Sequence, residues 1–309
     1  MTERCAYFIQ THRDPEQVYR LVRTLRRGSP DCVIVVQHNF GAGPLDMAPL
    51  ADLRDVHLLR VPYKQVRGNW SCQVQPTLDG IAWHEREGVD YDWLVTLTGQ
   101  DYPTKPLAVS ERMYRESGRD AFLRHWDIHA PQSPWPLHKP FRRYWYQYRR
   151  FDDGAMRWLR GLKVLSHLVP GTFVSLFYGP YAGVRARHTP WTNGFRCYGG
   201  WAWGALRREA ARYVIEYLDA HRDFTAFFRR TMSPEEAILQ TVLCNSGHFS
   251  LVDDDLRYHD YTGSLTGSPR TITVADVPML AEGPWCFARK FDVNVDREVL
   301  DRIDRELLG

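Results

Sequence analysis

The chain has 309 residues, of which 44% are hydrophobic and 25% charged, and its formal net charge is +3 at pH 7. This is the composition of an ordinary soluble protein, long enough to bury a substantial core as one large α/β domain or two closely joined ones. A net charge this small gives no argument by itself for a nucleic-acid or membrane partner.

Targeting and redox signals are weak. No apolar run approaches the roughly 18 residues that span a bilayer, and Met1 to Cys5 leads into a strand-like segment instead of a signal peptide. The six cysteines include no Cys-x-x-Cys pair and no histidine at metal-ligand spacing, so we expect free, mostly buried thiols. The expected location is cytoplasmic.

The first 125 residues alternate between strand and helix patterns. Strands are predicted at residues 6–10, 32–37, 57–61 and 121–124, with helices at 14–28, from 68 onward and at 108–116. Asp14 is expected to cap the first helix, with Pro15 at its first position, Gln17 completing a capping box and Gly28 at its end. No glycine-rich phosphate loop is present, so side chains would have to bind the phosphates of any nucleotide.

The stretch from Asp92 to Pro103 resembles a strand that delivers a loop to a site. Trp93 to Leu97 suits a strand buried on both faces, and Gly99 and Asp101 follow it. Ligands in open α/β sheets bind beyond the carboxyl ends of such strands. The alternative is a simple exit turn in which Asp101 bonds locally.

Residues 131–190 differ from the rest because they are rich in Trp, Tyr, Arg, Gly and Pro. From Ala121 to Pro190 there are eleven Arg or Lys against three Asp, a local charge of +8. The basic and aromatic run 141–150 could contact sugar faces, a lipid surface or single-stranded nucleic acid, or be a surface insertion with arginines over its own rings. We favour an acceptor-side insertion.

Several other residues have a functional and a structural interpretation. Trp70 could stack on a base or pack on the sheet. Trp201 and Trp203, in a glycine-rich turn expected before a helix, could form a carbohydrate platform or core. Glu236 could be a general base, or could bond back to Ser233 in a capping box. The cations Arg289 and Lys290 could bind an anionic leaving group or lie in solvent beside Asp292.

Taken in order, the motifs resemble the core-2/I-branching β-1,6-N-acetylglucosaminyltransferase and peptide O-xylosyltransferase family, in a soluble, bacterial-type form. The matching pieces cover nearly the whole chain apart from 131–190: Ala6-Tyr7-Phe8-Ile9 with His12 and Pro15-Glu16-Gln17, Trp70-Ser71, Thr98-Gly99-Gln100-Asp101-Tyr102-Pro103 with Lys105, Ser233-Pro234-Glu235-Glu236, Leu256-Arg257-Tyr258, Pro269-Arg270, and Phe287-Ala288-Arg289-Lys290-Phe291-Asp292.

The resemblance implies a GT-A glycosyltransferase fold: a Rossmann-like nucleotide-sugar-binding half at 1–125 and an acceptor-binding and catalytic half at 126–309, together one compact domain with a mixed central sheet. It implies a metal-independent, inverting transfer of GlcNAc or xylose from a UDP-sugar to an acceptor hydroxyl, with no cofactor. The implied roles are general base for Glu236; diphosphate binding for Arg270, Arg289 and Lys290; donor binding for His12, His38, Trp70 and Asp101; and acceptor binding for Trp201, Trp203 and Tyr258.

Other features of the sequence bear on this prediction. His38 stands where relatives have an aspartate near the nucleoside, and Gly200-Trp201-Ala202 replaces a more polar acceptor-side motif. Asp90-Tyr91-Asp92 and Asp253-Asp254-Asp255 are expected to be solvated acids and not a metal motif. The expected acceptor is a glycan, a small molecule or a lipid-linked precursor, with at most peripheral membrane contact and no nucleic acid. The alternatives are an inactive nucleotide-sugar- or carbohydrate-binding protein and a single-strand-binding protein.

Overall fold

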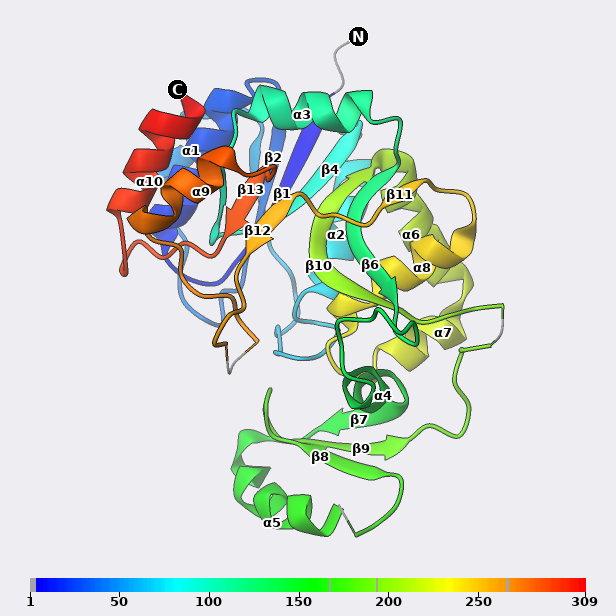
Figure 1. Ribbon diagram of the computed structural model, residues 1–309. Helices are drawn as coiled ribbons and strands as arrows, with labels where there is room; N and C mark the ends of the chain where they lie inside the picture. The colour runs from blue at the N-terminus through cyan, green and yellow to red at the C-terminus, as the bar shows by residue number, and fades with distance from the viewer. Residues whose placement is uncertain (1–3, 167, 193, 265–266) are drawn as a thin grey trace.

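The computed structural model describes residues 4–166, 168–192, 194–264 and 267–309. Its centre is a seven-stranded sheet in the order β11-β6-β10-β4-β1-β2-β3 (Figure 1). Its strands are β1 (Cys5–Thr11), β2 (Val33–His38), β3 (Val56–Leu59), β4 (Trp93–Thr98), β6 (Ala121–Asp127), β10 (Tyr198–Arg207) and β11 (Leu251–Val252). Because β10 pairs antiparallel with β4 and β6 while the other pairings are parallel, the predicted mixed α/β architecture is confirmed.

Both faces of the central sheet are covered. Along β1, Tyr7 and Ile9 point into one core cluster and Ala6 and Phe8 into the other, as expected for a strand buried on both sides. The first cluster is closed by α1 (Pro15–Gly28), α3 (Leu107–Glu116), α9 (Val277–Glu282) and α10 (Glu298–Ile303). The second is closed by α2 (Val74–Arg86), α6 (Arg208–Ala220), α7 (Arg222–Phe228) and α8 (Ile238–Ser246).

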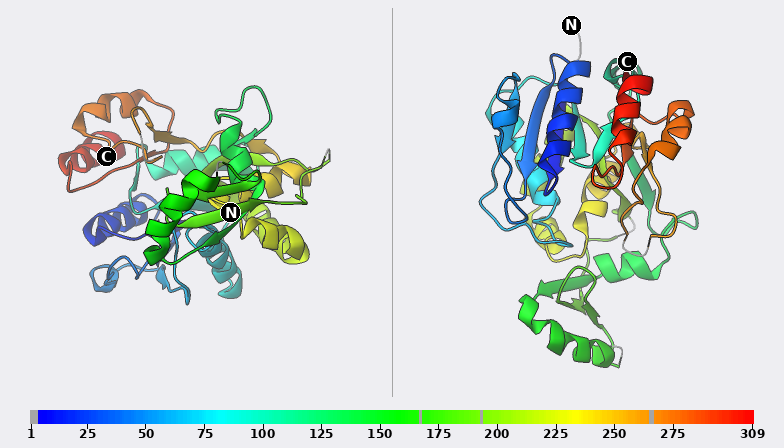
Figure 2. Two further views of the ribbon diagram at one scale, coloured as in Figure 1. Left: turned by 90° about the horizontal axis from the view of Figure 1, so that it is seen from below. Right: turned by 90° about the vertical axis from the view of Figure 1, so that its left-hand side faces the viewer.

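Two three-stranded sheets flank the centre. One consists of β12 (Arg257–His259), β13 (Phe287–Arg289) and β5 (Asp101–Pro103). The other consists of β7 (Tyr146–Arg150), β9 (Tyr181–Arg185) and β8 (Thr172–Ser175), and α4 (His138–Tyr144) and α5 (Met156–Ser166) accompany it. This second sheet and α5 stand apart from the central sheet, at the bottom of Figure 1 and of the right-hand view of Figure 2.

Short helical turns complete the fold. Four of these turns are 3-10 helices: η1 (Ala48–Leu50), η2 (Asp153–Ala155), η3 (Pro234–Glu236) and η4 (Val274–Asp276). The turn η5 (Asp304–Leu308) is a π-helix. All six cysteines are free thiols, as predicted. Within the described ranges, no helix is both long and apolar enough to cross a membrane.

The predicted capping box at the first helix is wrong. Asp14 has φ 51° and makes no side-chain cap bond. Gln17 instead donates from Nε2 to the carbonyls of Gly99 and Phe291, both at 3.0 Å, and accepts from the Val293 amide. Its side chain therefore joins α1 to two distant loops, and local spacing carries no sign of such long-range bonds.

The predicted glycine-rich turn at 199–204 is also wrong, because these residues lie inside β10. A β carbon on Gly200 would lie 1.9 Å from the carbonyl oxygen of Arg124 in β6. The register between the two strands shifts between Gly200 and Gly204. The glycines therefore allow close approach of strands at an irregularity, which is the other common use of glycine in sheets.

Three smaller expectations also need correction. Residues 68–73 form turns, and α2 begins only at Val74. The Ser233 side chain caps nothing, so the capping-box alternative for Glu236 is wrong. Asp255 is not solvated, since it is only 6% exposed and accepts from His259 at 2.9 Å. Burial raises the pKa of Asp255 to about 7.

Candidate functional site

A polar cavity of about 480 Å³ lies where three parallel strands end. The ends of β1, β2 and β4 and the loops that follow them supply about half of its wall, and the segment between β3 and α2, β10 and the 268–290 region supply the rest. The lining residues are Gln10, Thr11, His12, Arg13, Gln37, Asn39, Gln65, Arg67, Cys72, Gln73, Thr98, Gly99, Gln100, Trp203, Ser268, Arg289 and Lys290. This is the edge of an α/β sheet at which ligands bind.

Gly99 brings the loop after β4 close to β1 and α1. A β carbon at this position would lie 2.7 Å from Thr11 Oγ1, at the end of β1, and 3.0 Å from Val18 Cγ2, in α1, so any side chain would push the loop after β4 away from both elements. The Gly99 carbonyl also accepts from Gln17. Close packing and this long-range hydrogen bond together fix the floor of the cavity.

The cavity is strongly basic. Arg13, Arg67, Arg289 and Lys290 line it, and none of its described lining residues is Asp or Glu. Burial lowers the pKa of Lys290, and Arg13 and Arg289 lower it further. Burial, followed by Arg13, also lowers the pKa of His12. Such a surface suits a ligand with several negative charges.

The same surface offers little to a metal ion. Hard divalent cations prefer carboxylate and carbonyl oxygens, and the lining described above includes no carboxylate. Across the part of the chain that the structure describes, no group of three or more His, Cys, Asp or Glu side chains is placed to hold a metal ion. The positive charge that would balance an anionic ligand at this site therefore comes from side chains.

Asp101 lies behind the cavity and is completely buried. Its Oδ2 accepts from the Thr98 amide at 2.7 Å. Its carboxylate lies 3.5 Å from Arg289 Nε and 4.0 Å from Arg257 Nη1, and Arg257 donates to the Thr96 carbonyl. Asp101 thus forms an ion pair with Arg289 and is not itself part of the cavity lining, although among the described residues neither atom of the pair, Asp101 Oδ1 or Arg289 Nε, has a hydrogen-bond partner.

Glu236 meets an arginine from the insertion. Arg143 Nη1 donates to Glu236 Oε2 at 2.5 Å, and the two side chains are only 12% and 21% exposed. Lys139 lies one turn earlier in α4, where burial and then the neighbouring Arg143 lower its pKa to about 8, while Glu236 opposes that shift. No donor among the described residues reaches Glu236 Oε1, so one oxygen is held and the other remains available.

Three further bonds hold the segment that carries Glu236, two of them to α4 and one to the turn after β3. The Tyr144 hydroxyl donates to the Ser233 carbonyl at 3.1 Å, the Met232 amide donates to the Arg143 carbonyl, and the Ser233 amide donates to the Gly68 carbonyl. Ser233 itself has φ 51°. The position of Glu236 thus depends on contacts with α4 and with the turn after β3.

Glu235 and Trp203 connect Glu236 with the basic cavity. Both line a small apolar cavity beside it, and Gln73 and Trp203 belong to the walls of both cavities. Glu235 Oε2 is inaccessible and has no hydrogen-bond partner. Burial, and then the neighbouring Glu236, raise the pKa of Glu235 to about 7.

The three predicted acceptor-side aromatic residues lie in different surroundings. Trp203 lines the basic cavity, and the Arg289 guanidinium lies 5.2 Å from its ring centroid. Trp201 stacks on Tyr261 with ring centroids 5.2 Å apart, and both Arg289 and Glu236 affect the pKa of Tyr261, which burial raises to about 12. Tyr258 instead packs against Trp285 next to the first core cluster.

Of the predicted donor and diphosphate residues, His12, Arg289 and Lys290 line the cavity, whereas three others are engaged elsewhere. His38 is 1% exposed and its Nε2 bonds with the Gly43 carbonyl. Trp70 is 6% exposed, packs in the second core cluster and donates to Gln75. Arg270 donates to Asp260 at 2.5 Å and to Asp276 at 2.6 and 2.9 Å.

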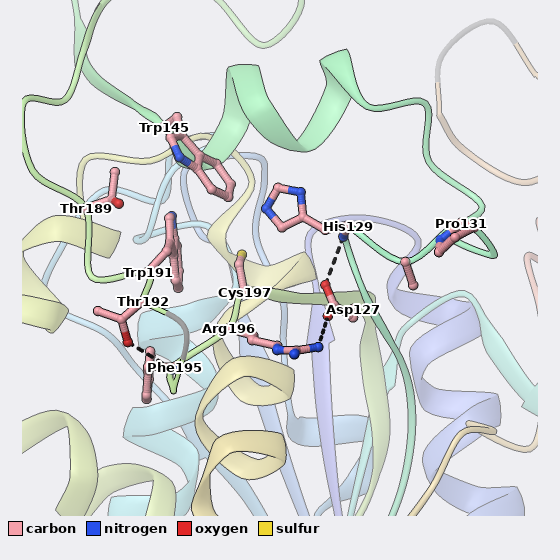
Figure 3. A pocket seen from close by; sticks show the side chains of 11 residues that line it. Asp127, His129, Pro131, Trp145, Thr189, Trp191, Thr192, Phe195, Arg196 and Cys197 are labelled. Carbon is pink, nitrogen blue, oxygen red and sulfur yellow. Dashed lines mark hydrogen bonds and ion pairs between the residues drawn. The ribbon is translucent and has the colours of Figure 1, made fainter.

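A second cavity, of about 870 Å³, lies between the insertion and the carboxyl end of β6 (Figure 3). Trp145 and Trp191 form aromatic walls with ring centroids 5.6 Å apart. Asp127 accepts from the His129 amide and from Arg196, both at 2.9 Å. Aromatic walls with a few fixed polar groups are typical of small-molecule sites. None of the predicted site residues lines this cavity.

The aromatic rings of the 141–150 run are mostly directed inward. Tyr144, Tyr146 and Tyr148 are all less than 10% exposed, and Phe141 stacks on Trp145. Stacking on unpaired bases requires open ring faces. The packing of this run therefore gives no support to a single-strand-binding surface.

Sequence reasoning missed two groups of site residues. The first comprises the polar residues at strand ends: Gln10 and Thr11 at the end of β1, Gln37 and Asn39 around the end of β2, and Thr98 at the end of β4. Their shared place after apolar runs was a usable signal. The second is the α4 pair Lys139 and Arg143, and Arg143 reaches Glu236 across 93 positions of sequence. Nothing local indicates that contact.

Comparison with known proteins gives one family match and several named relatives. The family model for the Core-2/I-Branching enzyme matches residues 181–280, which include Trp203 and Glu236. The chain is 27% identical over 239 residues to beta-glucuronosyltransferase GlcAT14A of Arabidopsis thaliana, covering 76% of this chain and 47% of that protein. With GlcAT14B of the same plant the identity is 24% over 320 residues, covering 99% and 66%.

A shorter match, 33% identical over 129 residues, is to xylosyltransferase 2 of Mus musculus and covers 36% of this chain and 15% of that protein. The chain spans about half to two thirds of the length of the plant relatives. These relatives are named as glycosyltransferases, and the matched family is one of enzymes. The family model and these named relatives bear out the resemblance to the core-2/I-branching enzyme family that the motifs predict.

Proposed function

We propose that this protein is an inverting glycosyltransferase of the GT-A type that moves a sugar from a UDP-sugar to an acceptor hydroxyl. The observation that carries the proposal is the basic cavity at the strand ends, with Arg289 and Lys290 in its wall and no carboxylate among its described lining residues. The names of the relatives add glucuronic acid to GlcNAc and xylose as donor sugars to be tested.

In the proposed reaction the acceptor oxygen attacks the anomeric carbon from the face opposite the diphosphate. The bond between that carbon and the β-phosphate oxygen breaks, and UDP departs with the electron pair of this bond. Glu236 takes the proton of the acceptor hydroxyl, for which Oε1 is available. Arg289 and Lys290 stabilise the negative charge that grows on the diphosphate, work that a metal ion would otherwise do.

Several contacts support these roles. The Asp101 carboxylate forms an ion pair with Arg289 at 3.5 Å and so favours a guanidinium held at the cavity, in line with transition-state stabilisation by preorganised groups. Arg143 holds one oxygen of Glu236 in place. The resemblance also assigns Arg270 to the diphosphate, but in this chain that role requires its guanidinium to leave Asp260 and Asp276, so the proposal does not depend on it.

The division of labour between the two parts of the chain follows the same proposal. Most residues that line the basic cavity precede position 101, whereas Trp203, Arg289 and Lys290 of its lining come later in the chain. Glu236, the proposed base, also belongs to the later part. We propose that the first part binds the nucleotide and that the later part, with the insertion, binds the acceptor. Trp145, in the wall of the second cavity, follows Arg143 by two residues, so an acceptor that extends into that cavity would contact the segment that holds Glu236.

The test is UDP release from UDP-GlcNAc, UDP-xylose and UDP-glucuronic acid in excess EDTA, with and without a panel of aryl glycosides as acceptors. We expect acceptor-dependent release with one donor, and its loss by at least about a hundredfold in Glu236→Gln, as for removal of a general base. Glu282→Gln, at an exposed glutamate ending α9, is the matched control. UDP binding without turnover across the panel would favour the inactive binding protein.

A further inference from the structure

The outermost part of the insertion exposes an unusual amount of apolar surface. Trp158 is 79% exposed, Leu162 49%, Leu168 75% and Val169 52%; we call these four residues the tip patch. Among the described residues, seven of the eleven exposed large apolar side chains lie between positions 151 and 184. Four exposed large apolar side chains within twelve positions of the chain indicate an interaction surface.

The helix α5 explains how the tip patch forms. Trp158 and Leu162 are four residues apart and so lie on one face of α5. Leu159 points to the other side and is only 4% exposed, which anchors the helix while the Trp158 face is left uncovered. Leu168 and Val169 lie just beyond the helix end and continue the apolar surface in the chain.

Positive charge surrounds the tip patch. From Gly154 to Pro190 the sequence contains Arg157, Arg160, Lys163, Arg185 and Arg187 and no Asp or Glu. Arg157, Arg160 and Lys163 are exposed on α5, and none of these three forms an ion pair with another described residue. An apolar strip flanked by unpaired cations on a helix is the pattern of a segment that lies in a lipid headgroup region.

The place of α5 in the fold fits a flat partner. Figures 1 and 2 show α5 at the end of the molecule farthest from the central sheet, on the outside of the small sheet β7-β9-β8. A planar surface could therefore reach the tip patch without meeting the rest of the chain. Tryptophan is also the side chain most typical of the boundary between lipid and water.

We infer that the tip patch docks this protein on an anionic lipid surface, with Trp158 and Leu162 entering the headgroup region, Arg157 and Lys163 beside them meeting the lipid phosphates, and Arg160, two residues from each apolar anchor and so on the far side of the helix, adding attraction at longer range. Charge selects this partner over a second copy of the chain, because two such patches would each bring their own cations and repel. The apolar centre selects it over nucleic acid, whose affinity comes mainly from phosphate contacts. The inference does not depend on the proposed reaction.

The test is co-sedimentation of the full chain with vesicles of phosphatidylcholine alone and with vesicles containing 30% phosphatidylglycerol. We expect binding to the anionic vesicles only, weakened when salt rises from 0.1 to 0.5 M. Trp158→Glu with Leu162→Glu should abolish binding. Arg157→Glu with Arg160→Glu and Lys163→Glu should weaken it at least tenfold.

The matched control for the triple charge variant is Arg115→Glu with Arg297→Glu and Arg305→Glu. It makes the same change in net charge at exposed arginines elsewhere on the protein. It should keep at least a third of the wild-type binding. Equal losses in the tip and control variants, or equal binding to neutral and anionic vesicles, would overturn the inference. So would a patch-dependent dimer, or patch-dependent binding to a single-stranded oligonucleotide, in a protein that does not bind the anionic vesicles.

Discussion

The contact between Arg143 and Glu236 makes a quantitative prediction. Its hydrogen bond is 2.5 Å long, and the side chains are 12% and 21% exposed. Hydrogen bonds to charged groups contribute about 1.5–3 kcal/mol, and removing one partner of a largely buried pair leaves the other charge uncompensated. Arg143→Met should therefore lower the free energy of unfolding by about 3 kcal/mol.

A double-mutant cycle isolates this contact. Arg143→Met, Glu236→Gln and the double variant are compared by urea unfolding, followed by circular dichroism and fluorescence together. We expect a coupling free energy of about 1.5–3 kcal/mol. The control is Arg142→Met, at the exposed neighbour whose guanidinium lies over Phe173. A coupling free energy below about 0.5 kcal/mol would mean that Arg143 does not hold Glu236 in solution.

Three other predictions follow from the charged groups of the site. Asp101→Asn removes the carboxylate charge facing Arg257 and Arg289. The free energy of unfolding in urea should therefore fall by about 3–5 kcal/mol. The control is Asp31→Asn, at an exposed site, and a fall no greater than that of the control would refute this prediction. The folded-state pKa of Glu235 is raised from 4.5 to about 7, so wild-type stability should fall as pH rises through that window. Compared with Glu235→Gln, the free energy of unfolding of the wild type should fall by up to about 3 kcal/mol over this pH range. Identical pH dependence of the unfolding free energy in the two proteins would contradict this. Arg270→Met should change UDP binding less than threefold in calorimetry, because its donors serve Asp260 and Asp276; a loss as large as that of Lys290→Ala would return Arg270 to the diphosphate site.

Much of the fold could be predicted because its strands carry strong local signals. The apolar runs at residues 6–10, 32–37 and 93–97 became β1, β2 and β4, and their pairing brought Gln10, Gln37 and Thr98 to one edge of the sheet. That arrangement follows from parallel strands alone. Arg289 and Lys290 reached the same edge through β13, as the resemblance implied.

The failures share a physical cause. Glycines at 199–204 favour a turn locally, but their neighbour across the sheet required glycine within a strand. Ser233 and Gln17 stand at capping positions, yet Ser233 caps nothing and Gln17 bonds with residues far away in sequence. The contact between Arg143 and Glu236 spans 93 positions. Local spacing describes what a residue can do in its own helix or turn, and tertiary partners decide what it does.

The most direct test of the proposed donor site is UDP binding by isothermal titration calorimetry in excess EDTA. The wild type should bind in the micromolar range, and Lys290→Ala should bind roughly ten- to a hundredfold more weakly, as for the loss of a hydrogen bond to a charged group. Lys64→Ala, at an exposed lysine, should bind as the wild type does. Absence of UDP binding, binding only after Mn²⁺ is restored, or an unchanged affinity in Lys290→Ala would contradict a metal-free diphosphate site.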